Sequence, residues 1–291
     1  MDDIWNLLLL QSSPNVTRRL LKQMIRQDPS LSTFIHSPPE RWHHQLSLPV
    51  ERANKIRNHV SDAFVNRTLS EALRRFHVLT IIDRKYPDAL KRIPDPPLVL
   101  YASGDLSLLE HNRRISVIGT RKPSSYALPA MKKIFLPMVE THCLVSGMAQ
   151  GVDQFAHQLA IKNGGRTIAI LGSGFNKVYP KNDLTLYQRL MTEELVLSEH
   201  APHIAPEKYH FPERNRLISG LSDATVVVEA RMKSGTMITV DQALEQGKEV
   251  YAFPGPVGSE TSEGCHFIID QGAKIVHTHH DILVPEQRSK G

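Results

Sequence analysis

The side chains best suited to bind an anion lie in one stretch of this 291-residue chain, Phe211 to Thr239. Pro212 is favourable as a first helical residue because it has no N–H to leave unpaired. Three polar side chains follow in the expected first turn, Arg214, Asn215 and Arg216. A helix start has free N–H groups and the positive end of the helix dipole. Arginines there destabilise the helix by repulsion, but together with the N–H groups they can bind a phosphate.

A second group of donors follows within the same stretch. Residues 225–229 (TVVVE) are a short β-branched run typical of a strand covered on both faces. Ser234, Gly235 and Thr236 come next and open another helix, with two hydroxyls and a backbone that a ligand can approach. The alternatives stay open at this point: the arginines could be ordinary surface residues, and Ser234 an ordinary capping residue.

Composition is that of a globular protein, with 41% apolar and 22% charged residues, and the length predicts two domains. We find no apolar run long enough to span a membrane, and the acidic N-terminus does not resemble a secretory signal. Cys143 and Cys265 form no metal or redox pattern, and Cys143 is interpreted as a buried thiol. A cytoplasmic location is therefore expected.

Glycine and charge both divide the chain near residue 104. The first glycine is Gly104, and residues 1–103 carry 15 Lys and Arg against 10 Asp and Glu, whereas residues 104–291 carry 20 of each. The positive charge of the chain therefore belongs to the N-terminal third, and an anion site in the rest would depend on local placement. We expect residues 1–75 to form a small helical docking or packing domain, because short apolar stripes alternate there with prolines. Residues 76–110 are expected to be a connector with edge strands.

Residues 111–291 alternate apolar strand candidates with helices. The strand candidates are ISVIG (115–119), HCLVSG (142–147), RTIAILG (166–172), LVLSE (195–199), ATVVVEA (224–230), EVYAFPG (249–255) and KIV (274–276). The helices are expected to begin near Ser124, Gln154, Asn182, Pro212, Thr236 and Glu263. This alternation predicts an α/β, Rossmann-like fold, a mostly parallel sheet with helices on both faces, preceded by the small all-α domain.

The loops after these strands should meet at one edge of the sheet. Most of them contain glycine, a hydroxyl or a basic residue, which predicts an anion or phosphate site there. The candidate residues are Gly119, Arg121, Lys122, Ser146, Gly147, Gly151, Lys181, Arg214, Asn215, Arg216, Ser234, Gly235 and Thr236. The loops match neither the P-loop pattern nor the G-x-G-x-x-G dinucleotide fingerprint, so no nucleotide cofactor is expected.

Candidate catalytic groups are few. Asp153 and His157 lie four residues apart, but no third metal ligand is apparent, and we interpret Asp153 as a helix cap and His157 as part of the helix wall. Glu199 and His200 end a strand without a visible partner, and Glu229 is expected to have a structural hydrogen-bonding role. We therefore expect no metal site, and the spacing supports no Ser/His/Asp catalytic set.

Six segments resemble the DNA-processing protein A (DprA, also called Smf) family of bacterial natural transformation. They are VIGTRKPSSYA from Val117, SGMAQGVDQFAH from Ser146, TIAILGSGFNKVYPKN from Thr167, FPERNRLISGLS from Phe211, VVVEARMKSGTMIT from Val226 and FPGPVGSETSEGCHFIIDQGA from Phe253. The resemblance covers about residues 115–276 and implies an extended Rossmann-like domain, usually dimeric. It also implies single-stranded DNA binding, RecA recombinase loading against single-strand-binding protein, and no catalysis.

The resemblance assigns the DNA backbone to Arg121, Lys181 and the Arg214–Arg216 turn. The glycine and hydroxyl loops would add backbone and side-chain donors. Aromatic rings near the basic loops could stack on bases, namely Phe175, Tyr179, Tyr209, His210 and Phe211, with packing the expected role for Phe211.

The chain departs from the family in three places. Gln150 stands where Arg or Lys is common, the winged-helix domain of many members is not expected here because the chain stops soon after Val284, and residues 1–75 only loosely resemble the sterile-alpha-motif-like domain. The alternative function is a nucleotide phosphoribohydrolase of similar fold. Those enzymes carry a PGGxGTxxE-like run, and Thr239 stands near the place of its catalytic glutamate, which argues against that activity.

Overall fold

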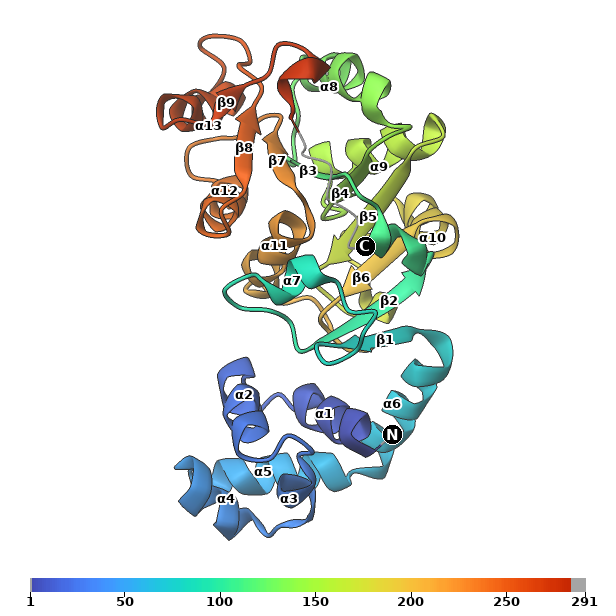
Figure 1. Cartoon of the computed structure of the whole chain (residues 1–291), viewed down its shortest axis with the longest axis vertical. Coiled ribbons are helices and arrows are strands. Elements are labelled where there is room, and N and C mark those ends of the chain that lie inside the picture. Colours follow the sequence, from blue (N-terminus) through green and yellow to red (C-terminus); the bar gives the residue numbers. More distant parts are fainter. Residues whose placement is uncertain (1, 284–291) are drawn as a thin grey trace.

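The computed structural model describes residues 2–283, and its first part is a group of helices at one end of the molecule (Figure 1). They are α1 (Asp2–Ser12), α2 (Arg18–Gln27), α3 (Ser32–His36), α4 (Pro39–Leu46), α5 (Val50–Ser61) and α6 (Ala63–Arg75). Thr17 caps α2 and Asp62 caps α6, because each side chain accepts hydrogen bonds from N–H groups of the following turn. The helices expected in this region are therefore present.

The rest of the described chain is built around one mixed sheet. Its strands are β1 (His77–Thr80), β2 (Val99–Gly104), β3 (Arg114–Ile118), β4 (Cys143–Ser146), β5 (Arg166–Leu171), β6 (Leu195–Ser198), β7 (Ala224–Val227), β8 (Glu249–Ala252) and β9 (Lys274–Ile275). Their order is β1-β2-β6-β5-β4-β3-β7-β8-β9. β1 pairs with β2 and β2 with β6 in antiparallel fashion, and all other neighbours are parallel. The segment 76–110 thus adds two antiparallel strands to the parallel sheet, and β1 is the edge strand on that side.

Helices cover both faces of this sheet (Figure 1). They are α7 (Asp88–Lys91), α8 (Ala127–Phe135), α9 (Val152–Lys162), α10 (Leu184–Glu193), α11 (His210–Leu221), α12 (Gly235–Glu245) and α13 (Glu260–Asp270). Side chains of α11, α12 and α13 pack in one core with Ile168 and Ile170 of β5, whereas α8 and α9 pack in another with Ile115 and Val117 of β3. Because alternate residues of a strand face opposite sides, each buried strand is apolar on both. The Rossmann-like fold class is confirmed.

All six helices expected here begin within three residues of the predicted starts, and α8 and α13 differ most, by three residues each. α8 begins at Ala127 rather than Ser124, because the N–H and Oγ of Ser124 bind the carboxylate of Glu229. α11 begins at His210, so Pro212 is the third helical residue rather than the first. Short 3₁₀ helices complete the connections at Leu106–Glu110, Leu136–Met138, Phe175–Lys177 and His279–Asp281.

The helical region and the sheet share one hydrophobic core. Leu8, Leu21 and Trp42 belong to the same buried cluster as Ala169 and Leu171 of β5. The ring of Phe76, at the end of α6, stacks on that of Phe175 with centroids 4.7 Å apart. The helical region therefore packs against the sheet through a shared core.

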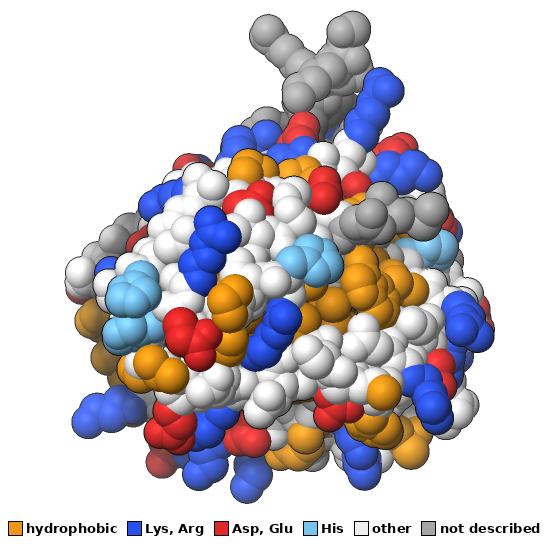
Figure 2. All heavy atoms as spheres, turned by 90° about the horizontal axis from the view of Figure 1, so that it is seen from below, with side chains coloured by type: hydrophobic (Ala, Val, Ile, Leu, Met, Phe, Trp, Pro, Cys, Tyr) orange, Lys and Arg blue, Asp and Glu red, His pale blue; other side chains and the backbone are white. Residues whose placement is uncertain are grey.

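The end face of the helical region does not gather positive charge. Figure 2, which views the molecule from below, shows an apolar patch, with basic side chains scattered over the face among acidic ones. Within residues 2–283 no helix is both long and apolar enough to cross a bilayer. The same residues contain no cluster of three or more His, Cys, Asp or Glu side chains that could hold a metal ion.

Candidate functional site

A cavity of about 710 Å³ opens at the carboxyl ends of the parallel strands. β3 and β7 are neighbours, but the chain continues from β3 to β4 on one side and from β7 to β8 on the other. Ligands of open α/β sheets bind at such a reversal of strand order. The cavity is lined by Ile118, Gly119, Thr120, Arg121, Ala149, Asp153, Tyr179, Pro206, Glu207, Lys208, Phe211, Pro212, Arg214, Asn215, Ile218, Arg231, Ser234, Gly235, Thr236 and Thr239.

One wall of the cavity is the N-terminus of α12. Ser234 precedes this helix in an extended conformation, and its side chain makes no capping hydrogen bond. Its Oγ is buried, yet no partner for it is present among the described residues. Apart from its chain neighbours and the backbone of α12, no atom of the described residues lies within 4 Å of the place where a Cβ would sit on Gly235. The free N–H groups and the positive end of the helix dipole are thus accessible to an anion.

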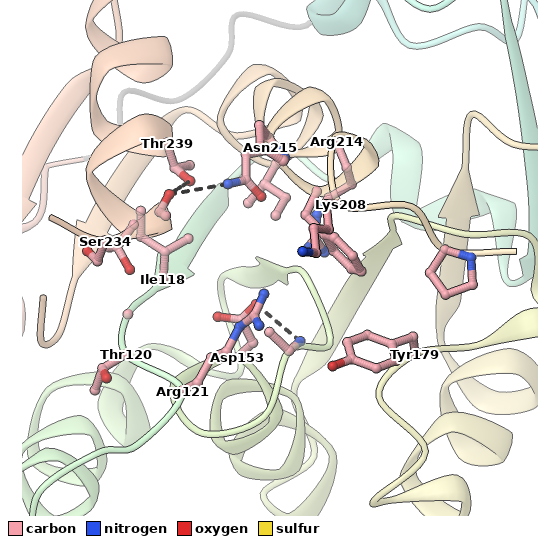
Figure 3. A pocket seen from close by; sticks show the side chains of 18 of the residues that line it. Ile118, Thr120, Arg121, Asp153, Tyr179, Lys208, Arg214, Asn215, Ser234 and Thr239 are labelled. Atoms are coloured by element: carbon pink, nitrogen blue, oxygen red, sulfur yellow. Dashed lines mark hydrogen bonds between the residues drawn. The ribbon is translucent and has the colours of Figure 1, made fainter.

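The opposite wall combines a cation with aromatic rings. The guanidinium carbon of Arg121 lies 5.8 Å from the centroid of the Phe211 ring. The rings of Phe211 and Tyr179 are 5.6 Å apart, and Tyr179 is 48% exposed. Figure 3 shows Ser234 and Thr239 on one side of the view, Tyr179 on the other, and Arg121 between them. This wall suits a nucleobase stacked on a ring beside a phosphate near the guanidinium.

Two buried side chains, Arg214 and Asp153, form the floor of the cavity, and each binds backbone groups. Arg214 is only 5% exposed and donates hydrogen bonds from Nη1 to the carbonyls of Gly147 and Ile170. Asp153 accepts from the N–H groups of Gly147 (3.1 Å) and Ala149 (3.3 Å). Arg214 therefore joins the loop after β4 to the end of β5, and Asp153 fixes the loop before α9.

Burial changes the pKa of both groups. It lowers the pKa of Arg214 to about 10, although the nearby charge of Asp153 opposes this change. It raises the pKa of Asp153 above its ordinary value, against the charge of Arg214 and the backbone N–H donors. The interpretation of Asp153 as a helix cap was wrong, because its carboxylate binds the preceding loop rather than the first turn of α9.

The cavity brings together about half of the candidate residues. Those that line it are Gly119, Arg121, Arg214, Asn215, Ser234, Gly235 and Thr236. Gly147 lines a smaller cavity of about 60 Å³ beside it, together with Arg121, Arg214 and Gln150. Lys122 and Lys181 are exposed next to lining residues but do not line either cavity.

Ser146 and Gly151 shape the loops from inside. Ser146 is fully buried, and its Oγ donates to the carbonyl of Val117 at 2.6 Å, so it does not face a ligand. Gly151 has a φ of 89°, and a Cβ there would meet backbone atoms of Thr120 and Arg121. Only glycine fits this close approach.

Arg216 does not line the cavity, although the sequence placed it among the candidate anion-binding residues. It is 8% exposed, and its Nη2 binds both carboxylate oxygens of Glu199, at 2.8 and 3.0 Å. Residues two apart on a helix point about 200° away from each other, so Arg214 and Arg216 cannot face the same cavity. Glu199 has partners after all, because Arg18 of α2 contacts it as well.

Other expected stacking rings are divided between core and surface. Phe175 and His210 are buried, whereas Tyr209 is 62% exposed and lies outside the cavity lining. Phe211 combines the expected packing with a place in the cavity lining. Glu229 has the predicted structural role, since it accepts hydrogen bonds from Ser124 and Thr261.

Sequence reasoning missed two basic residues of the cavity, Lys208 and Arg231. Lys208 stands two residues before α11, and Arg231 lies in the loop after β7, so each occupies the same edge as the predicted residues. Their position at this edge was the sequence signal that could have identified them. Arg231 pairs with Glu260 at 2.9 Å, and both side chains are mostly exposed. Thr239 faces the same cavity, and its Oγ1 donates to the carbonyl of Gly235 at 3.4 Å.

The structure therefore defines a Rossmann-like protein whose switch point combines a helix N-terminus, an arginine and two aromatic rings, a combination suited to a phosphate-bearing ligand. The chain belongs to the DprA/Smf family, since the family model described as DNA recombination-mediator protein A matches residues 77–286. The DNA processing protein DprA of Streptococcus pneumoniae is 40% identical over 215 residues, covering 74% of this chain and 76% of the relative. That of Bacillus subtilis is 41% identical over 218 residues, covering 72% of each.

Two solved structures extend this similarity to three dimensions. The X-ray structure of S. pneumoniae DprA matches with a TM-score of 0.84 and 31% identity, over 99% of this chain and 98% of the other. A structure of Helicobacter pylori DNA processing protein A matches with a TM-score of 0.64 and 28% identity, over 71% of this chain and 94% of the other. The H. pylori structure concerns the single-stranded DNA binding mode of that protein.

Proposed function

We propose that this chain binds single-stranded DNA in the cavity at the switch point and performs no chemistry on it. The observation that carries the proposal is the cavity itself, where the open N-terminus of α12 faces a wall of Arg121, Phe211 and Tyr179. Binding without sequence preference needs phosphate neutralisation and stacking surfaces rather than a base code. The N-terminus of α12 and Arg121 would neutralise phosphates, and the rings of Phe211 and Tyr179 would provide the stacking surface.

The proposed contacts are more limited than the sequence suggested. Arg121, Asn215 and the α12 start would meet the strand directly, with Lys208 and Arg231 added to them. Lys122 and Lys181 would contact phosphates beyond the cavity, since both are exposed next to its lining. Arg214, Gly147 and Gly151 would support the loops, and Ser146 and Arg216 would take no part in contact.

The wider role follows from the family. In this proposal a cytoplasmic homodimer protects incoming DNA and loads the RecA recombinase onto it during natural transformation. The description of the family as recombination mediators and the single-stranded DNA binding of the H. pylori relative support this role. Residues 1–75 and 76–110 would act as accessory unit and connector, and residues 111–291 as the DNA-binding domain. The part of that domain beyond Leu283 lies outside the described residues.

Replacement of Arg121 by alanine tests the site. Single-stranded DNA affinity should fall about tenfold, the size expected for a lost charged contact. The slope of log affinity against log salt should also fall by about 0.7, because one phosphate contact is removed. Both quantities can be measured by fluorescence anisotropy with a labelled oligonucleotide.

Arg67→Ala is the matched control, since Arg67 is exposed on α6 and does not line the cavity. Equal affinity of the two variants would place the DNA elsewhere. Release of free base from nucleoside monophosphates by the wild-type protein would contradict the non-catalytic role and favour the phosphoribohydrolase alternative.

A further inference from the structure

An ion cluster connects the helical region to the helix that carries much of the cavity lining. We call it the α2–α11 ion cluster. It comprises Arg18 and Lys22 of α2, Asp95 of the proline-rich connector, Glu199 after β6, and Glu213 and Arg216 of α11. Three cations and three carboxylates from four separate segments therefore meet at one place. None of the six side chains lines the cavity.

Glu199 is the centre of this cluster. Arg18 contacts it from the helical region, with Nε 3.0 Å from one carboxylate oxygen and Nη2 3.2 Å from the other. Arg216 contacts the same two oxygens from α11. The side chains of Glu199 and Arg216 are only 10% and 9% exposed, so solvent weakens this contact little. Two-pronged arginine–carboxylate contacts also fix orientation, which a single charge contact does not.

Asp95 adds a second connection from α2. Its carboxylate accepts from Lys22 at 2.7 Å and from Arg18, and lies 3.6 Å from Nε of Arg216. Burial alone would raise the pKa of Asp95, but the Lys22 hydrogen bond and the two arginine charges hold it below its ordinary value. Its neighbours Pro94, Pro96 and Pro97 restrict the backbone that presents it.

The same turn of α11 serves the cluster and the cavity. Glu213 and Arg216 belong to the cluster, whereas Pro212 and Asn215 line the cavity. On its other flank α11 is held by α12, where Gln242 donates to the carbonyl of Pro212 at 3.0 Å. Likewise Gln246 donates to the carbonyl of Arg216 at 2.9 Å. Without the cluster, α11 would keep the α12 contacts but lose its connection to α2.

We propose that Arg18 is a positioning residue for the cavity: through Glu199 and Arg216 it fixes the orientation of α11, and so makes the helical region part of the binding site. This inference rests on the proposed function, because the ligand is taken to be single-stranded DNA. It gives residues 1–75 a role in binding that requires no contact with the strand.

Arg18→Met tests this proposal, with Arg19→Met as the matched control. Both variants remove one positive charge from α2, but Arg19 is exposed and contacts neither the cluster nor the cavity. Arg18→Met should lose single-stranded DNA affinity by roughly fivefold or more, the lower range of coupling between sites. The slope of log affinity against log salt should stay at the wild-type value, because Arg18 contacts no phosphate.

Hydrogen exchange of α11 provides a readout independent of DNA. Amides of α11 should exchange faster in Arg18→Met than in Arg19→Met, while those of β3, β4 and β5 should keep their protection. If Arg18→Met does not fold, Arg18→Lys, which keeps the charge but loses the two-pronged contact, is compared with Arg19→Lys in the same two measurements. A smaller affinity loss with the same exchange pattern is then expected.

Equal DNA affinity and equal α11 exchange in the Arg18 and Arg19 variants would overturn the proposal. A changed salt slope in Arg18→Met would also overturn it, since Arg18 would then contact DNA directly. If the wild-type protein binds no single-stranded DNA, the proposed function fails, and the exchange of α11 alone decides whether Arg18 positions it.

Discussion

At the scale of single residues, the sequence indicated which residue types could bind an anion and at which edge of the sheet they lie. It did not indicate which way each side chain points. The sequence placed Arg214 and Arg216 in one helical turn. Helix geometry directs Arg214 to the cavity floor and Arg216 to the α2–α11 ion cluster. The residue spacing contained that information, because two residues on a helix differ by about 200°. The partner Arg18 could not have been found this way, since it lies 181 residues before Glu199.

The buried side chain of His157 predicts how the unfolding free energy changes with pH. Burial lowers its pKa to about 3, and Nδ1 lies 2.7 Å from Oγ1 of Thr167. The unfolded chain binds a proton near the ordinary value of 6.5, whereas the folded protein does not, so stability is complete above 6.5 and falls as pH decreases toward 3. His157→Gln should reduce this fall by up to about 1.4 kcal/mol per pH unit.

Urea denaturation between pH 7 and pH 4 measures the effect. His36→Gln is the control, because His36 is exposed on α3. Identical pH dependence of unfolding in wild type and His157→Gln would show that this imidazole is not held neutral. The absolute stability of the variant does not matter for this comparison, since only its change with pH is used.

At the scale of elements, the strands were predictable because they are short, apolar runs between glycine-bearing loops. All seven candidates in residues 111–291 became strands, and residues 76–110 supplied β1 at the edge with β2 between β1 and β6. The strand order was not predictable, because nothing local in β2 specifies its pairing with β6, nearly a hundred residues later. The start of α8 was misplaced for a similar reason, since Glu229, 105 residues away, holds Ser124.

The loop between β4 and α9 gives a test at this scale. A Cβ on Gly147 would meet the guanidinium of Arg214, which cannot move freely because it is buried and hydrogen-bonded. Gly147→Ala should therefore destabilise the protein by about 1–3 kcal/mol. Gly147 is not among the glycines with positive φ, so steric contact rather than backbone strain is the cause.

Gly235→Ala is the counterpart at the other wall. Beyond its neighbours in α12, a Cβ there meets no atom of residues 2–283 within 4 Å, so the unfolding free energy of the variant should stay within about 1 kcal/mol of wild type. Urea midpoints of both variants provide the comparison. Equal midpoints would mean that Arg214 does not pack on Gly147 as described.

At the scale of the whole molecule, the helical region, the connector and the sheet meet around α11. The shared core of Leu8, Leu21 and Leu171 supplies the apolar contact, and the α2–α11 ion cluster supplies the orientation. The sequence assigned positive charge to the N-terminal third and suggested a separate packing domain. The structure places part of that charge, Arg18 and Lys22, in internal ion pairs. Net charge alone therefore overstated what is available for an acidic partner.

The measurement that tests the account most directly is an equilibrium titration of the wild-type protein with labelled single-stranded and duplex oligonucleotides at several salt concentrations. The account predicts tighter binding of the single strand, because unpaired bases can reach the rings of Tyr179 and Phe211, and an affinity that falls steeply as salt rises. Absence of single-strand binding at low salt, or equal binding of duplex, would contradict it.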